Sequence, residues 1–238
     1  MTKREKLSNF ILENFSLLEY DSGSGKSLKF PEFQLHALDY LKFAEEEMEN
    51  RTTRSLINCI SHLKHATDCQ MDTFLHVLNL YKVFDKKNLK FDVKLKFLKD
   101  IGLFSSKSLS RLNVFRNRME HYYEVPKIND IEVYYDLITA FVGVLQGALS
   151  ILANYGSGVG MYIDETENNS FTRFSIEYHY DEQQITANWD TKELEEELIV
   201  KVNEQDDFTY FLKVLFLIHH RESYASDSYI INQLAIVI

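Results

Sequence analysis

Three polar residues that can take part in phosphate chemistry stand within six positions of one another. Arg116, Asn117 and His121 supply a planar cation, an amide and an imidazole. A guanidinium group binds phosphate through two parallel hydrogen bonds, and an imidazole transfers protons near neutral pH. Together these groups suit the cleavage of a phosphodiester bond without a metal ion.

Helical spacing limits how these residues can meet. Asn117 and His121 are four residues apart and share a helix face, whereas Arg116 and His121 are five apart and diverge by about 140°. Only a long side chain such as arginine can reach across that angle. The alternative is structural, because Arg116 can pair with Glu120 at helical spacing while His121 stabilises the negative end of the helix dipole. Spacing alone favours this structural alternative.

The elements around these residues are expected to be helices. The residues themselves lie late in a helix that begins at Ser105 or Ser106 and ends before Pro126, since proline disfavours helical backbone in the residue before it. A short basic helix over residues 91–101 precedes this helix. A long helix over residues 130–155 follows it.

The run Arg116-Asn117-Arg118-Met119-Glu120-His121 resembles the signature of the HEPN superfamily, which is an arginine, a small polar residue, a short spacer and a histidine. It lies where that family has it, late in one helix and before a turn into a long final helix. Tyr123 extends the run to a pattern similar to HEPN toxins whose partner nucleotidyltransferases modify that tyrosine. The resemblance covers residues 30–155. It implies an antiparallel helical bundle that is often homodimeric, and many members are metal-independent ribonucleases, whereas others bind without cutting.

The resemblance also implies roles for individual residues. His121 would act as general base or acid in the attack of a ribose 2′-hydroxyl, Arg116 would stabilise charge on the phosphate, and Asn117 would orient the reacting groups. One histidine does not easily make both proton transfers, so a homodimer would bring two motifs together, or water would make one transfer. Tyr123 is a candidate modification site, with a nucleotidyltransferase antitoxin as partner. No metal or cofactor is expected.

A basic segment leads into the motif. Residues 82–118 carry a local net charge of +8 within a chain whose net charge is −10, which leaves −18 on the remaining residues. Phosphate contacts supply most non-specific nucleic-acid affinity, so this segment predicts RNA binding. The alternative is a solvated lysine face. The residues expected to contact RNA are Lys94, Lys99, Arg111 and Arg118.

A second polar row is expected on the long helix that runs from about residue 53 to residue 84. Asn58, His62, His65, Cys69 and His76 fall on one side of it at 100° per residue. Two histidines and a thiol can bind zinc, but a single helix face rarely encloses a metal, so no metal site is predicted. Asn58, His62 and His65 remain candidates for supporting the chemistry, facing solvent, a dimer partner or the motif helix.

The whole chain predicts a mainly α fold. Residues 1–29 form an N-terminal helix, over residues 3–20, that packs on the adjoining domain and is followed by a flexible linker. Residues 30–155 form the HEPN-like antiparallel helical bundle. Residues 156–238 form a small α+β domain with an antiparallel sheet, since their hydrophobic residues alternate with a period of two.

Three further sequence patterns limit the possible functions and the location of the protein. Gly25-Lys26-Ser27 matches the end of a phosphate-binding loop, but Tyr20 stands where its first glycine is required, so this segment is interpreted as linker. Residues 137–153 are apolar and contain Gly143 and Gly147, and they are interpreted as a buried helix with close backbone contacts rather than a membrane span. With two cysteines and no signal-peptide pattern, a cytoplasmic location is expected.

The negative charge outside the basic segment indicates an alternative to the ribonuclease function. The charge of −18 outside the basic segment favours a non-catalytic module that mediates protein assembly or senses a ligand.

Overall fold

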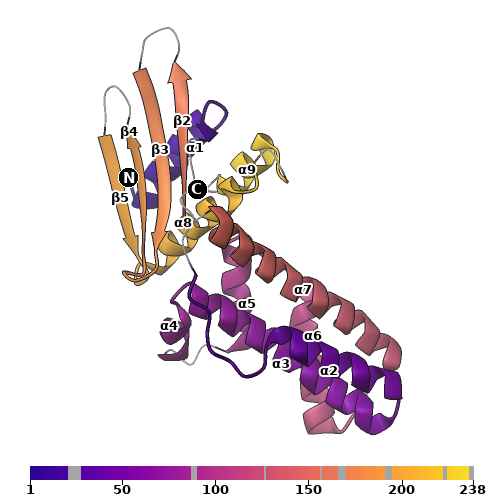
Figure 1. Ribbon diagram of the computed structural model, residues 1–238. Coiled ribbons are helices and arrows are strands. Elements are labelled where there is room, and N and C mark those ends of the chain that lie inside the picture. Colours follow the sequence, from indigo (N-terminus) through magenta and orange to yellow (C-terminus); the bar gives the residue numbers. More distant parts are fainter. Residues whose placement is uncertain are drawn as a thin grey trace. The chain divides into compact units, whose positions relative to one another are not determined.

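The computed structural model describes residues 1–20, 28–86, 90–125, 127–155, 157–165, 170–190, 195–221 and 224–235. The expected linker and the Gly25-Lys26-Ser27 run lie outside these residues. The fold is mainly helical, with an antiparallel sheet (Figure 1). The chain forms two compact units. Unit 1 comprises Met1–Leu28, Lys99–Leu103 and Ser150–Ile238, and unit 2 comprises Lys29–Leu98 and Phe104–Leu149.

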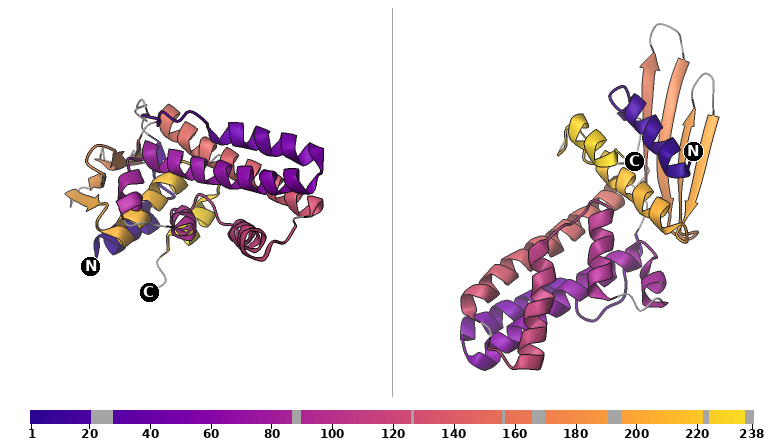
Figure 2. Two further views of the ribbon diagram at one scale, coloured as in Figure 1. Left: turned by 90° about the horizontal axis from the view of Figure 1, so that it is seen from below. Right: turned by 180° about the vertical axis from the view of Figure 1, so that it is seen from behind.

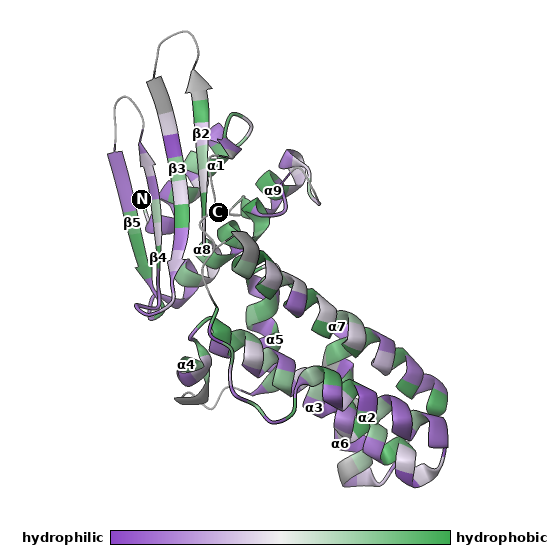
Figure 3. Cartoon of the chain, in the orientation of Figure 1, coloured by the Kyte–Doolittle hydropathy of each residue, from purple (hydrophilic) through white to green (hydrophobic). Residues whose placement is uncertain are grey.

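Unit 1 is built on an antiparallel sheet whose strand order follows the sequence, β1-β2-β3-β4-β5. The predicted alternation of buried and exposed residues is confirmed, and Figure 3 shows hydrophobic and hydrophilic bands along β3. The N-terminal strand was not predicted, because residues 19–20 were assigned to a helix. The strands are β1 (Glu19–Tyr20), β2 (Gly158–Glu165), β3 (Ser170–His179), β4 (Gln184–Asp190) and β5 (Glu195–Lys201).

Helices α1 (Lys3–Asn14) and α8 (Gln205–Ile218) cover one face of this sheet (Figure 2). The ring of Phe10 stacks on Phe174 and Trp189, with centroid separations of 5.3 and 4.7 Å. Tyr178 is fully buried and meets Phe208 edge-on at 5.8 Å. The expectation that the N-terminal helix packs on the adjoining helical domain is therefore corrected, because its apolar row is buried in unit 1.

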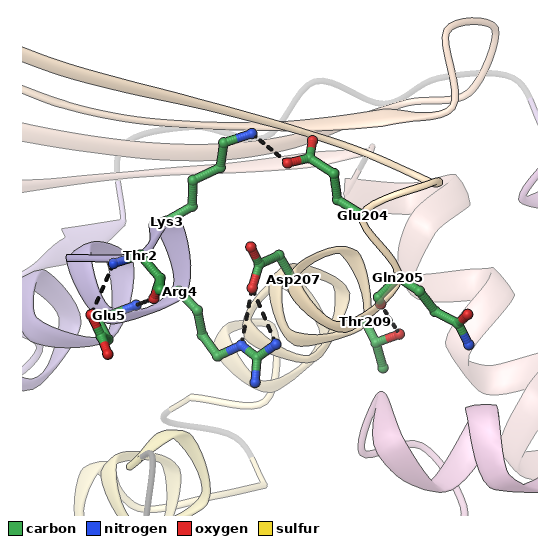
Figure 4. A network of polar contacts seen from close by, with 8 residues as sticks. All are labelled: Thr2, Lys3, Arg4, Glu5, Glu204, Gln205, Asp207 and Thr209. Carbon is green, nitrogen blue, oxygen red and sulfur yellow. Dashed lines mark hydrogen bonds and ion pairs between the residues drawn. The ribbon is translucent and has the colours of Figure 1, made fainter. Parts of the chain in front are cut away.

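Polar contacts fix the start of α1 within the same unit (Figure 4). The helix begins with a capping box, in which Thr2 Oγ1 accepts from Glu5 N at 3.2 Å and Glu5 Oε2 accepts from Thr2 N at 2.8 Å. Such reciprocal caps satisfy backbone donors that the first helical turn leaves unpaired. Ion pairs then tie the first residues of the chain to those before and within α8: Lys3 Nζ to Glu204 Oε2 at 2.6 Å, and Arg4 to Asp207 Oδ1 at 3.1 Å.

Within its described residues, unit 2 consists of helices and the segments that connect them, without a strand. Helices α2 and α3 form a hairpin, with Arg51 in the left-handed region (φ 51°) between them and Thr52 capping α3. The predicted core row of α3 is buried, including Ile60, Leu63 and Phe74. The helices are α2 (Ala37–Asn50), α3 (Thr53–Val77), α4 (Tyr81–Lys86), α5 (Phe91–Asp100), α6 (Lys107–Tyr122) and α7 (Ile128–Tyr155), the last residues of α5 and α7 falling in unit 1.

The long apolar helix α7 is partly buried. Among the described residues its segment Ile128–Ala153 is the one helix long and apolar enough to cross a membrane by length and composition, and 39% of that apolar window is buried. Among the described residues, no other segment of the chain makes the expected close backbone contacts at Gly143 and Gly147. A Cβ atom at either glycine would meet no other atom within 4 Å.

Candidate functional site

The motif helix α6 is fixed at both ends by its caps. Ser106 Oγ accepts a hydrogen bond from Leu109 N at 3.1 Å, which confirms the predicted start. Leu109 and Leu112, which are 0% and 3% exposed, anchor the helix in unit 2. The helix ends at Tyr122, and Tyr123 follows with left-handed backbone (φ 59°, ψ 28°). The candidate residues therefore occupy the last turns of an anchored helix.

An exposed row of polar residues runs along α6 on the side away from its buried leucines. Arg111, Asn117, Arg118 and His121 are all exposed. Arg111 and Arg118 are seven residues apart, so they lie on one face about 10 Å apart along the helix axis. Asn117 and His121 share a face at a spacing of four, as predicted. The row thus places two guanidinium groups, an amide and an imidazole on one exposed surface.

Arg116 occupies a different position around the helix. Its backbone lies within α6, whereas its side chain and that of Glu120 lie outside the described part of the structure. Position 116 follows Leu109 by seven residues and Leu112 by four, so it continues the row of the two buried leucines. His121 belongs to the exposed row. The helix thus keeps the backbone positions of Arg116 and His121 on separate sides, in agreement with the predicted divergence.

Two adjacent tyrosines follow the polar row. The side chains of Tyr122 and Tyr123 are 75% and 86% exposed. A non-glycine residue in the left-handed region costs about 1 kcal/mol, so the turn holds Tyr123 in a mildly strained conformation. Tyr122 was not among the predicted site residues, although its place directly after His121 is visible in the sequence.

The predicted RNA ligands come from two helices, α5 and α6. Lys94 Nζ pairs with Asp72 Oδ1 at 2.6 Å, and its side chain is only 20% exposed. Its ammonium group is thus occupied within the protein. Lys99 is exposed but belongs to unit 1. Of the four predicted ligands, Arg111 and Arg118 remain together beside the motif, because both lie on α6.

A cavity of about 370 Å³ lies between α3, α5 and α6. Leu112 of α6 and Ile60 and Thr67 of α3 line it, so this is the side of α3 that faces the motif helix. Ion pairs contribute charged groups to its wall, namely Lys64 with Asp68 and Lys94 with Asp72. In each of these two pairs the charges neutralise one another, and Lys90 adds one further cation to the lining.

The supporting candidates Asn58, His62 and His65 face another helix. Asn58 Nδ2 donates to Glu47 Oε1 of α2 at 3.0 Å. The ring of Tyr40, also on α2, lies against His62 and His65, with centroid separations of 6.5 and 5.3 Å. Figures 1 and 2 show α2 and α6 on opposite sides of α3. The row therefore lies against α2 and not against the motif helix, whereas the side chain of His65 is exposed, in agreement with the solvent-facing alternative.

Neither cysteine is suited to nucleophilic chemistry. Burial, with a contribution from Glu47, raises the pKa of the Cys59 thiol to about 12. Burial also raises the pKa of Cys69, whose Sγ lies 3.6 Å from the carbonyl oxygen of Leu35. Within the described ranges, no group of three His, Cys, Asp or Glu residues is placed to hold a metal ion.

Comparisons of the chain with protein-family models, with curated proteins and with solved structures found no match. The function of the site is therefore inferred from its own residues.

Proposed function

We propose that the chain is a metal-independent, HEPN-type endoribonuclease of a toxin or phage-defence kind, located in the cytoplasm. The observation that carries this proposal is the exposed end of α6, which gathers guanidinium, imidazole, amide and phenol groups within thirteen residues, Arg111 to Tyr123. The motif lies late in this helix and before a turn into the long helix α7, the order that the HEPN resemblance implies.

Each group has a role in the cleavage of single-stranded RNA. Arg111 and Arg118 bind backbone phosphates, and Tyr122 and Tyr123 stack on unpaired bases. His121 removes the proton from a ribose 2′-hydroxyl as it attacks the adjacent phosphorus, and the 5′-oxygen leaves with a proton from a second donor. Arg116 stabilises the charge on the phosphate, and Asn117 orients the groups.

The second proton donor comes from another copy of the chain or from water. Positions 116 and 121 lie on different sides of α6, so a homodimer that pairs Arg116 of one copy with His121 of the other assembles a composite site more readily than one helix does. Tyr123, which is 86% exposed, is accessible to a partner nucleotidyltransferase that acts as antitoxin by modifying its hydroxyl group.

A cleavage assay tests this proposal. Purified protein is incubated with labelled single-stranded RNA at neutral pH in excess chelator. The Arg116→Ala and His121→Ala variants are expected to lose cleavage while keeping their helical circular-dichroism signal. Arg54→Ala, which removes an exposed arginine at the start of α3, is the matched control and is expected to cleave normally. Full activity in both motif variants would rule out the assigned roles.

Mixing the two inactive variants tests the composite site. Heterodimers of Arg116→Ala and His121→Ala protomers contain one intact composite site, so part of the activity returns. Full activity of a protein that light scattering shows to be a monomer at the assay concentration would exclude this arrangement.

The second candidate function is a non-catalytic binding or regulatory module with the same helical unit. The ion pair between Lys94 and Asp72 favours it, because it removes a cation from the predicted RNA surface. Binding of RNA or protein without any cleavage, at protein concentrations well above the dissociation constant, would identify the chain as such a module.

A further inference from the structure

The sheet of unit 1 carries a shallow trough on the face opposite α1 and α8. The trough has a volume of about 600 Å³, within the range of ligand-binding sites. Its outward-facing polar side chains come from three adjacent strands, and they are Arg173 and Ser175 of β3, Asn188 and Asp190 of β4, and Glu195 and Glu197 of β5.

Strand register explains the shape of the trough. Gly160, Ser175, Asn188 and Glu197 are consecutive register partners across β2, β3, β4 and β5. Neighbouring strands are about 4.8 Å apart, so this row spans about 14 Å across the sheet. Three of its four residues have short side chains or none. A depression therefore runs across the strands.

The charge around the trough is asymmetric. The adjoining row pairs Arg173 with Asp190, and Asp190 with Glu195. Together with Glu197, three carboxylates on β4 and β5 stand against a single guanidinium on β3. The β5 side of the trough is thus negative, while the β3 side offers a cation.

The outward-facing polar side chains of the trough have no protein partner among the described residues. Within the described residues, none of these six side chains makes a hydrogen bond or an ion pair. Other polar side chains of the unit near the trough are paired: Tyr162 donates to Glu19 at 3.2 Å, Ser157 to Glu177 at 3.4 Å, and His179 bonds Thr186 at 2.9 Å. Glu196 also lines the trough, and it pairs with Lys6 of α1 at 2.5 Å. Pairing thus leaves out the outward-facing side chains of the trough.

We propose that this trough binds a short peptide segment that carries a basic side chain. An arginine or lysine of the segment lies among Asp190, Glu195 and Glu197, where opposite charges complement one another. Arg173 donates to a backbone carbonyl or terminal carboxylate of the same segment. Ser175 and Asn188 on the floor offer both donors and acceptors, which match the amide groups of a peptide.

The proposal is independent of the ribonuclease function, because every residue that it uses belongs to unit 1, whereas the motif belongs to unit 2. A failure of one does not imply a failure of the other.

Fluorescence anisotropy with two matched probes tests the proposal on the full chain. One labelled hexapeptide has two arginines in a glycine and serine background, and its twin has glutamates in their place. The protein is expected to bind the basic peptide at least tenfold more tightly than the acidic one, with an affinity that falls as salt concentration rises.

Three variants locate the binding. Glu195→Gln with Glu197→Gln is expected to weaken binding of the basic peptide about tenfold, since exposed charge pairs contribute up to about 1 kcal/mol each. Ser175→Trp fills the floor without changing charge and is expected to weaken binding as well. Glu182→Gln, in the turn after β3, removes an exposed carboxylate outside the trough and is expected to leave the affinity unchanged. Thermal unfolding of each variant verifies that the sheet is intact.

Equal affinity for the two peptides, or unchanged affinity in both folded trough variants, would overturn the proposal. Spermidine that binds as tightly as the basic peptide would overturn the assignment to a peptide, because a polyamine offers charge but no amide groups.

Discussion

Arg221 holds Asp227 through two hydrogen bonds, from Nε to Oδ1 at 3.1 Å and from Nη2 to Oδ2 at 3.2 Å. Arg221 is only 6% exposed, and its guanidinium also lies over the ring of Phe15 and donates to the carbonyl oxygen of Leu18. A bidentate pair of this kind is geometrically specific. With its hydrogen bond to Leu18, Arg221 thus joins the segment after α1 to the start of α9 (Asp227–Leu234).

The Asp227→Asn variant is expected to lower the free energy of unfolding by about 1–3 kcal/mol, because it leaves a buried guanidinium without its counter-charge. Urea denaturation at neutral pH measures this change. Glu13→Gln, which alters an exposed carboxylate of α1, is the control and is expected to change stability by less than about 0.5 kcal/mol. Equal stability of the Asp227 and Glu13 variants would contradict the role of the pair.

His219 makes the protein sensitive to acid. Burial, and secondarily the neighbouring His220, lowers the pKa of His219 to about 4. Between an unfolded pKa near 6.5 and this folded value, the unfolded chain binds a proton that the folded chain does not. Stability therefore falls by about 2–3 kcal/mol as pH drops from 6.5 to 4. Denaturation midpoints across this window are expected to fall less in His219→Gln than in the parent protein, whereas His121→Gln, at an exposed site, follows the parent.

The left-handed Tyr123 predicts opposite effects of two neighbouring glycine substitutions. Glycine adopts φ 59° without strain, so Tyr123→Gly is expected to leave the free energy of unfolding unchanged or raise it by up to about 1 kcal/mol. Tyr122→Gly, inside the helix, is expected to lower it by about 1 kcal/mol. Thermal unfolding compares the two. Destabilisation by Tyr123→Gly of the same size would show that its side chain makes contacts that outweigh the strain.

The salt dependence of RNA binding distinguishes cations that contact phosphates from those that do not. For a single strand, each lost phosphate contact reduces the slope of log affinity against log salt by about 0.7. Arg111→Ala and Arg118→Ala are each expected to show this reduction, measured in the inactive His121→Ala background. Lys94→Ala is expected to keep the parent slope, since Lys94 pairs with Asp72. A reduced slope for Lys94→Ala would show that Lys94 contacts RNA phosphates despite its pairing with Asp72.

Local sequence signals were sufficient for several elements of the fold. Ser106 marks the start of α6 because its hydroxyl caps the helix, and the period-two pattern marks β3 and β4 because alternate side chains face the core. These signals depend on neighbours within a few positions. The boundaries they predict agree with the structure to within a few residues.

Contacts between distant segments were not predictable in the same way. The pairing of Glu19 with Tyr162 joins residues far apart in the chain, and nothing near residue 19 indicates it. Likewise, the sequence shows that His62 and His65 share a helix face. It does not show that α2 packs against this face, because several helices of the chain offer an apolar side for packing. The sequence presents Lys94 as a cation available to RNA, because nothing near it in the chain indicates its ion pair with Asp72, 22 positions earlier.

Unit 1 combines segments that come before and after unit 2 in the sequence, and this order affects how the protein is synthesised. A ribosome makes α1 before unit 2, but the sheet and α8 that bury Phe10 and Phe15 emerge only after all of unit 2 has been made. At about 5–20 residues per second, that interval lasts roughly 10–40 s. During this interval the apolar side chains of α1 lack the partners that bury them in the folded protein. This is therefore the stage at which the protein most needs a chaperone, such as those that bind exposed hydrophobic segments near the ribosome exit.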